Sequence, residues 1–351
     1  MKIYERNDGG WKIEFIYSPF FEMLCSLHVL TKPEHHLERL AWAGGMKNKM
    51  DRKLYDEIMY FGTNFDEYCP IMDLDMYCQD VDDLNIIYAL EKICEIDIEN
   101  FVYALLGEKI EKDRVGYCIK HKSFEGLNLS KEQLGVFANP EGCRVRFISC
   151  LKEYYYLFFE KELKFIEPLL IRILKRQIEQ YDSYGTLKYI DTLHSRIEVG
   201  EDALYFHKYT KFTVPFGDLK HVIIMPSSFI DPHLLIGIKN ESTLQLTIRA
   251  HLSEVAEEIP LDLFKTMRAL GDETRLKILK NIYRTNSSTQ SLAKELGLTE
   301  ACISKHLKIL YEADILYKER KGNYIYYLLN KMVLDRIPTD IYQYIDGGTI
   351  R

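Results

Sequence analysis

The spacing of apolar residues changes along the chain and predicts a helical part, a β-rich part and a final helical module. Residues 11–17 (WKIEFIY) alternate like a strand, and apolar residues three or four apart predict a helix over 18–30. A mostly helical pattern covers 47–106. One or two long helices, with a break at their proline, are predicted over 147–181. Short β-prone runs separated by Gly, Pro and Asn follow over 196–250 and predict a small sheet.

The pattern then becomes helical again, in short amphipathic segments. Gly271 ends a first helix, predicted over 261–270, and Asp272 can cap a second, predicted over 273–283. The residues expected to face inward on these two helices are Leu263, Met267, Leu270, Leu276, Leu279 and Tyr283. The two helices form the start of a compact C-terminal module.

A third short helix ends at Gly297, where a left-handed backbone favours glycine. Thr299 can cap a fourth helix, in which Ile303, Leu307 and Leu310 recur at i, i+4 and i+7 and face inward. The outer positions of that helix are then Ala301, Ser304, Lys305 and Lys308, flanked by Cys302 and His306. A short helix, a glycine turn and a second helix form a helix-turn-helix, whose second helix can enter a DNA major groove.

Residues 316–329 (LYKERKGNYIYYLL) predict a β-hairpin directly after that helix. Two β-prone arms surround a Gly-Asn turn, and Lys318, Arg320 and Lys321 lie near the tip. Cations at this position can reach phosphates or the minor groove. The hairpin is therefore expected to act as the wing of a winged helix-turn-helix.

These motifs together resemble the ArsR/SmtB family of winged helix-turn-helix repressors. The residues that carry the resemblance are 264–279 (FKTMRALGDETRLKIL), 292–316 (LAKELGLTEACISKHLKILYEADIL) and 319–329 (ERKGNYIYYLL), about one fifth of the chain. The resemblance implies a dimeric bacterial transcription factor, usually a repressor that a signal releases. The segments SPFFEMLCSLHVL and HVIIMPSSF…HLLIGIK also resemble an uncharacterised domain found ahead of such modules, which brings no known activity.

Carried over to this chain, the resemblance implies a set of DNA-binding residues on the fourth helix and the wing. They are Thr299, Ser304, Lys305, His306, Lys308, Arg320, Lys321, Asn323 and Tyr324. Glu300, Ala301 and Cys302 stand where the family usually has small polar residues, which leaves the base preference open. The family's metal sensors carry paired thiols where this chain has Ser288 and Gln290, so we expect no metal and no cofactor.

The charge is unevenly distributed along the chain. The net charge is −7, but residues 261–330 hold 12 Lys and Arg against 8 Asp and Glu, a balance of 12 − 8 = +4. The remainder must then carry −11, and a locally basic module suits a polyanion partner. The eight cysteines form no CxxC pair, and neither a membrane-spanning run nor a secretory segment is evident, which favours a cytoplasmic protein. GxGxxG, P-loop, HExxH and GxSxG motifs are absent, so we expect no enzyme.

We therefore predict an α+β protein with a mostly helical N-terminal domain, a small β-sheet and a C-terminal winged helix-turn-helix. The N-terminal domain would cover 1–255, helical over 1–190 and β-rich over 191–250, and serve effector sensing or dimerisation. The winged helix would cover 259–335 and a tail 336–351. The predicted function is a bacterial transcriptional regulator, a dimeric repressor whose binding to operator DNA is controlled by a small-molecule effector. The alternatives are a protein-interaction adaptor, and an enzyme with a DNA-binding appendage.

Other features of the sequence allow two interpretations each. Cys302 beside Lys305 and His306 suits a redox thiol or a small, partly buried helix residue. The acidic, thiol-bearing run 64–83 suits a metal site or ordinary helix caps, and His35–His36 suits a surface pair. The aromatic run 153–165 suits either the lining of an effector pocket or plain core. In each of these cases the structural interpretation is preferred.

Overall fold

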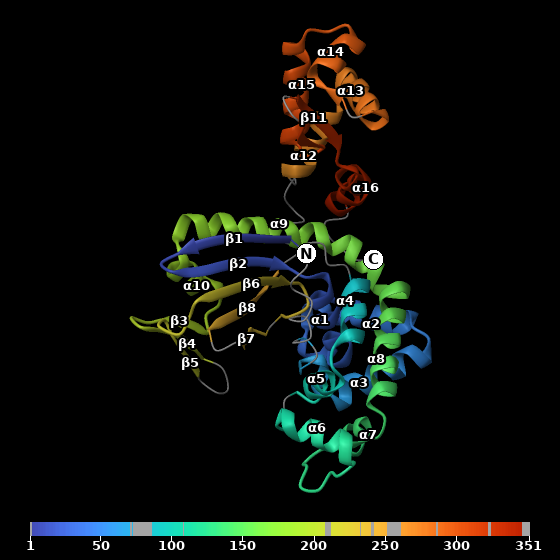
Figure 1. Ribbon diagram of the computed structural model, residues 1–351, viewed down its shortest axis with the longest axis vertical. Coiled ribbons are helices and arrows are strands. Elements are labelled where there is room, and N and C mark those ends of the chain that lie inside the picture. The colour runs from blue at the N-terminus through green and yellow to red at the C-terminus, as the bar shows by residue number, and fades with distance from the viewer. Residues whose placement is uncertain are drawn as a thin grey trace. The chain divides into compact units, whose positions relative to one another are not determined.

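The computed structural model divides the chain into two compact units, Met1–His251 and Leu252–Arg351 (Figure 1). It describes residues 2–70, 72, 86–107, 109–207, 212–231, 233–239, 242–250, 261–285, 287–321 and 324–345. Within these residues no helix combines the length and the apolar character that crossing a membrane requires. Helices and small sheets in both units confirm the predicted α+β class.

A five-stranded sheet of order β1-β2-β6-β8-β7 organises the N-terminal unit. Its strands are β1 (Lys2–Asp8), β2 (Trp11–Tyr17), β6 (His221–Ser227), β7 (Leu235–Lys239) and β8 (Thr243–Arg249). β1 and β2 form an antiparallel hairpin, β2 and β8 each run parallel to β6, and β7 runs antiparallel to β8. At the centre of the sheet, Ile224 of β6 is paired with Phe15 of β2 on one side and with Leu246 of β8 on the other.

This sheet corrects the expected division into a helical 1–190 and a β-rich 191–250. The first strands of the chain belong to the same sheet as its strands beyond residue 220. The physical reason lies in β2, where Ile13, Phe15 and Ile16 are all buried. A strand buried on both faces needs neighbours that cover it, and β6 with its buried Val222 and Ile224 provides one.

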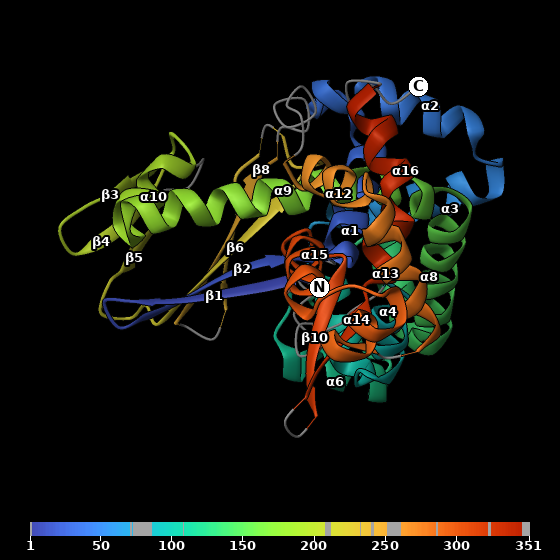
Figure 2. The same cartoon turned by 90° about the horizontal axis from the view of Figure 1, so that it is seen from above.

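The long helix α9 (Glu160–Tyr184) runs along the sheet and packs on β2 and β6 (Figures 1 and 2). The predicted break at Pro168 is wrong, because α9 continues through this buried residue. A proline inside a helix loses one backbone hydrogen bond and costs about 3 kcal/mol. Ile166, Leu169 and Leu170 are fully buried around it, and their packing offsets that cost.

The aromatic run before α9 contributes to the core. It ends α8 (Pro140–Tyr154) and forms a π-helical turn, Tyr155–Phe159, that leads into α9. Tyr154 is buried with its hydroxyl 2.8 Å from Oγ of Ser26, and Phe159 packs near Phe229. Tyr154 and Phe159 thus fit the core interpretation of the run, whereas Tyr156 is 58% exposed and lies at the surface.

The helix α1 (Pro19–Thr31) is fully buried and contacts α2 (Leu40–Lys49), α3 (Arg52–Asn64) and α4 (Ile86–Glu95). α5 (Ile98–Leu105), α6 (Lys112–His121) and α7 (Lys131–Ala138) pack on one another or on α8, and α10 (Thr186–Leu193) packs on α9. Short 3-10 turns occur at η1 (Pro33–His35), η2 (Leu37–Arg39) and η3 (Asp66–Tyr68). The second sheet consists of β3 (Ile197–Val199), β4 (Ala203–Phe206) and β5 (Phe212–Pro215).

A buried polar network holds α1, α9 and the end of β6 together. Oε1 of Glu22 accepts hydrogen bonds from the backbone N–H of Ser228 at 3.0 Å and from its hydroxyl at 2.6 Å. Arg39 donates to the Ser228 hydroxyl at 2.6 Å and lies 3.5 Å from Oε1 of Glu162. Burial raises the pKa of both carboxyl groups, and their hydrogen bonds and the guanidinium act in the opposite direction.

The C-terminal unit forms its own core from helices and a small sheet. Its elements are α12 (Leu261–Leu270), α13 (Glu273–Arg284), β9 (Ser287–Ser288), α14 (Thr289–Leu296), α15 (Glu300–Glu312), β10 (Leu316–Lys321), β11 (Tyr324–Leu329) and α16 (Lys331–Ile345). Ile303, Leu307 and Leu310 are fully buried, as the spacing predicted. They pack in one cluster with Ile278 and Leu292.

Three of the residues expected to face inward do not. Met267 on α12 is 46% exposed, and Leu276 and Tyr283 on α13 are 51% and 66% exposed. The inward face of α13 is formed by Ile278 and Ile282 instead, together with Leu279. Leu276 and Tyr283 have helical spacing, and so do Ile278 and Ile282, so periodicity alone cannot tell which pair faces the core. The position of α15 determines that Ile278 and Ile282 do.

Candidate nucleic-acid interface

The turn between α14 and α15 has the geometry that the sequence predicted. Ser288 caps α14, accepting from the backbone N–H of Ser291, whose own hydroxyl accepts from the backbone of Ser288. Gly297 follows with φ of 66° in the left-handed region. Thr299 then caps α15, since its Oγ1 accepts from the backbone N–H of Cys302 at 3.2 Å. These caps set the angle at which α15 leaves the turn.

A corner between α12 and α13 supports α15 from behind. Asp272 caps α13 by accepting from the backbone N–H of Arg275 at 2.9 Å. The Arg275 guanidinium donates to the carbonyl oxygens of Ala269 at 2.5 Å and Arg268 at 2.9 Å, which closes the end of α12. The hydrogen bond from Arg275 is the largest of the causes that lower the pKa of Asp272.

His306 lies on the inner side of this arrangement. Its Nδ1 is 3.8 Å from Oδ1 of Asp272 and is buried without a hydrogen-bond partner among the described residues. The side chain was expected to face DNA together with Ser304 and Lys305. Its position between α15 and the start of α13 suits a role in positioning the helix.

The outer face of α15 carries the other predicted residues. Thr299, Ser304, Lys305 and Lys308 are exposed, and Lys308 lies 3.7 Å from Oε1 of Glu312 one turn later. Glu300 is exposed at the first turn, and Cys302 is half-buried. The face therefore offers hydroxyls and cations next to a single carboxylate at its N-terminal end.

The hairpin of β10 and β11 extends away from the helices of this unit (Figure 2). β11 also pairs with β9, where Tyr326 faces Ser288, so the hairpin is fixed to the start of α14. Nζ of Lys318 lies 3.6 Å from the ring centroid of Tyr311, which joins β10 to the end of α15. Tyr311 is not among the predicted site residues; a cation six residues after the helix, on the strand that follows it, is the signal that points to it.

The predicted wing residues lie at the far end of this hairpin. Arg320 is exposed on β10, two residues from Lys318 and hence on the same face of the strand. Lys321 and Tyr324 form the last backbone pair before the turn. Asn323 lies outside the described residues.

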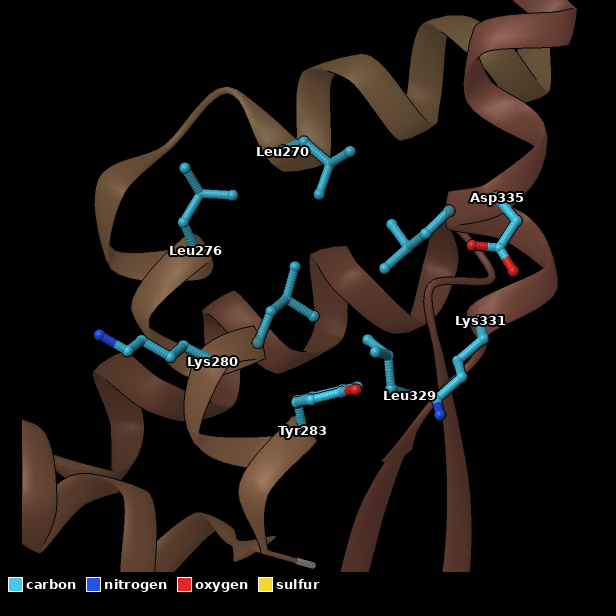
Figure 3. A pocket seen from close by; sticks show the side chains of 9 residues that line it. Leu270, Leu276, Lys280, Tyr283, Leu329, Lys331 and Asp335 are labelled. Atoms are coloured by element: carbon cyan, nitrogen blue, oxygen red, sulfur yellow. The ribbon is translucent and has the colours of Figure 1, made fainter.

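An apolar groove of about 510 Å³ lies on the exposed side of α13, away from the buried Ile278 and Ile282 (Figure 3). Its walls combine α13, the end of α12, the end of β11 and the start of α16. Its lining residues are Leu270, Leu276, Leu279, Lys280, Tyr283, Leu329, Lys331, Leu334 and Asp335. The exposed stripe of α13 that was expected in the core therefore lines a surface groove.

Comparison with known families matches both units. Residues 272–318 match the family described as bacterial regulatory protein, arsR family, and residues 9–252 match a family of unknown function (DUF5937). The second match covers more than half of the chain.

Two known repressors match this chain over about 80 residues, less than a quarter of its length. The transcriptional repressor SdpR of Bacillus subtilis (strain 168) is 33% identical over 81 residues, which cover 23% of this chain and 90% of that protein. The arsenical resistance operon repressor of the same organism is 32% identical over 80 residues, 22% of this chain and 76% of that protein. A solved structure of an ArsR-like transcriptional regulator from Rhodococcus sp. RHA1 matches with 28% identity over 24% of this chain and 80% of that one, at a TM-score of 0.23.

Proposed function

Because the chain belongs to a family of unknown function (DUF5937) and carries a C-terminal domain of the arsR family of bacterial regulatory proteins, we propose that it regulates transcription by binding DNA. The two repressors to which it is similar support this role. The single observation that carries the proposal is the exposed outer face of α15, held by the capped turn at Gly297.

In this proposal the N-terminal half of α15 enters the major groove of operator DNA. Ser304 and Lys305 reach base edges and nearby phosphates, and Thr299 and Lys308 add contacts to the backbone. Glu300 can accept from the N4 amino group of cytosine, but it repels phosphate. His306 acts through its position against Asp272 rather than through the DNA.

The wing supplies phosphate affinity. Arg320, Lys321 and Tyr324 belong to the hairpin that is anchored on Tyr311 and on Ser288, and Asn323 lies between its two strands in the sequence. Each phosphate that a cation neutralises releases counterions, so the contribution of the wing depends on salt and hardly on base sequence.

The acting species in this proposal is a homodimer. Phe264 and Met267 on α12 and Ile345 on α16 are apolar and exposed, and α12 and α16 contact one another within the unit. Apolar patches of this kind on a soluble protein mark interaction surfaces. Two copies joined there would place two recognition helices about 34 Å apart, one turn of the duplex.

We further propose that the N-terminal unit controls operator binding through a small-molecule effector, so that the protein acts as a repressor. A ligand with different affinity for two arrangements of the dimer shifts their populations, and with them the spacing of the recognition helices. The separate compact unit Met1–His251, larger than a DNA-binding module requires, supports this assignment.

Salt dependence separates this function from that of a protein-interaction adaptor. A gel-shift assay with the DNA upstream of the chain's own gene should give specific binding that weakens steeply between about 50 and 200 mM salt, by ~10³-fold or more for six phosphate contacts. Cell extract added to the same assay should release the DNA if it contains the effector. Absence of specific binding at low salt would contradict DNA regulation.

A further inference from the structure

Three histidines from distant parts of the N-terminal unit meet in its interior. His28 lies in the last turn of α1, His36 directly follows η1, and His233 lies between β6 and β7. One ring nitrogen from each lies within 4.8 Å of the other two. The prediction of a surface pair at His35–His36 is therefore wrong for His36, which is only 1% exposed, while His35 is exposed.

Backbone carbonyl groups fix the orientation of two of the rings. Nδ1 of His28 lies 2.8 Å from the carbonyl oxygen of Glu67, and Nδ1 of His36 lies 2.5 Å from that of Asp231. A carbonyl oxygen can only accept, so each Nδ1 donates its hydrogen and each Nε2 keeps a lone pair. Histidines that bind metals through one nitrogen almost always have their other N–H held in this manner.

The Nε2 atom of His36 is a buried polar atom that calls for a ligand. It is buried and has no hydrogen-bond partner among the described residues. Buried polar atoms are rarely left in this state, since the loss of hydration then has no compensation. The ring of His36 lies close to the other two: its centroid is 4.9 Å from that of His28 and 5.0 Å from that of His233.

We propose that His28, His36 and His233 form a site for a divalent transition-metal ion of the zinc class. Neutral imidazole is a common ligand of zinc, nickel and copper, and three histidines leave a further coordination position for water or a small ligand. With metal–nitrogen distances of about 2.0–2.1 Å, tetrahedral ligands lie about 3.3 Å from one another. The nitrogens lie within 4.8 Å of one another, so binding a metal requires them to approach by at most about 1.5 Å.

The surroundings favour the neutral form that a metal requires. Burial is the largest cause that lowers the pKa of His28, and it lowers that of His36 to about 4. Two residues before His233, the carboxylate of Asp231 lies 2.7 Å from Nε of Arg249. Cys69 lies outside the site: its Sγ is 3.6 Å from Nδ1 of His28, the nitrogen already bonded to Glu67.

A metal here departs from the expectation that the chain holds none, which rests on Ser288 and Gln290 in the winged helix. The three histidines belong to another part of the chain, residues 9–252. Bound metal would join the end of α1 to the loop between β6 and β7, two segments of the N-terminal unit. The proposal stands independently of DNA binding, because its tests require no DNA.

Equilibrium dialysis of the full-length, chelator-treated chain against Zn²⁺ tests the proposal. We expect one equivalent bound through the histidines, with Mg²⁺, which prefers oxygen ligands, failing to compete. His36→Asn and His233→Asn should each weaken zinc binding by more than about 100-fold. The reason is that removing a group that only hydrogen-bonds to a metal ligand already lowers metal affinity ~10–100-fold. His121→Asn, at an exposed histidine of α6, and Cys69→Ser should retain it.

A measurement on the unmodified chain keeps the test decisive if a buried variant fails to fold. X-ray absorption of the zinc-loaded chain should show imidazole nitrogens at about 2.0–2.1 Å. Sulfur at about 2.3 Å would place the ion on cysteines and overturn the assignment. The absence of bound zinc would also overturn it. The same holds if folded His36→Asn and His233→Asn variants bind zinc as tightly as the unmodified chain.

Discussion

Nδ1 of His306 lies 3.8 Å from Oδ1 of Asp272, so the middle of α15 meets the residue that caps α13. The same carboxylate accepts from the backbone of Arg275, whose guanidinium closes the end of α12. One short segment thereby connects three helices. We therefore expect Asp272, Arg275 and His306 to determine the orientation of the proposed recognition helix.

Loss of this cap should destabilise the C-terminal unit. Asp272→Ala removes the acceptor for the Arg275 backbone and the carboxylate near His306, and we expect a loss of about 1 kcal/mol in the free energy of unfolding, within ~0.5–2. Chemical denaturation monitored in this unit measures it. Asp272→Asn keeps an acceptor oxygen and should lose less. Equal stability of the Ala variant and the wild type would show that the cap contributes nothing.

The charge of Asp272 should also make stability depend on pH. Its folded pKa is lowered, chiefly by the hydrogen bond from Arg275, so the unfolded chain binds a proton more readily than the folded one. The stabilisation is complete above the ordinary carboxyl pKa of about 3.9 and is lost as the pH falls through the lower folded value. Unfolding of the wild type and of Asp272→Asn, compared across this range, should give a difference that shrinks towards acid pH. A pH-independent difference would contradict this.

Gly297 should be required for its backbone conformation alone. A Cβ there would meet no atom within 4 Å, but φ of 66° is strained for residues that carry one. Gly297→Ala should therefore cost about 1–2 kcal/mol, and Gly297→Asn less, because asparagine tolerates this region better. Gly217→Ala is the matched control, since its added Cβ also meets open space and its φ is not positive. Thermal unfolding that ranks both alanine variants alike would refute the strain argument.

The sequence was sufficient where local chemistry determines the structure. Capping residues and the glycine at 297 set the boundaries of α14 and α15, and both were correctly placed. It was insufficient where distant segments decide. The stripes on α13 could not be ranked without α15, and nothing local announces that His28 and His36 meet His233, about 200 residues later. The DNA-contacting residues stay a prediction.

Exposed apolar residues of α12 should contribute to dimerisation. Phe264→Ser/Met267→Ser removes apolar surface that is exposed in the single chain, so its own unit should fold normally. Sedimentation equilibrium should show a larger proportion of monomer than in the wild type. Leu157→Ser/Tyr156→Ser changes exposed side chains of the N-terminal unit and serves as the control. An unchanged monomer–dimer equilibrium in the α12 variant would assign the interface elsewhere.

Reversal of two charges tests the central claim most directly. Lys305→Glu/Arg320→Glu alters one cation on the recognition helix and one on the wing, and Lys53→Glu/Lys161→Glu applies the same charge change to exposed positions of the N-terminal unit. Gel shift on the upstream DNA, measured over a range of salt concentrations, is the assay. We expect the first variant to fold normally and lose binding, and the second to bind like the wild type. Milder Ala substitutions at Lys305 and Arg320 should reduce the salt slope by about 1 each. Wild-type affinity in the folded Lys305→Glu/Arg320→Glu variant would contradict the assignment of α15 and the wing to DNA.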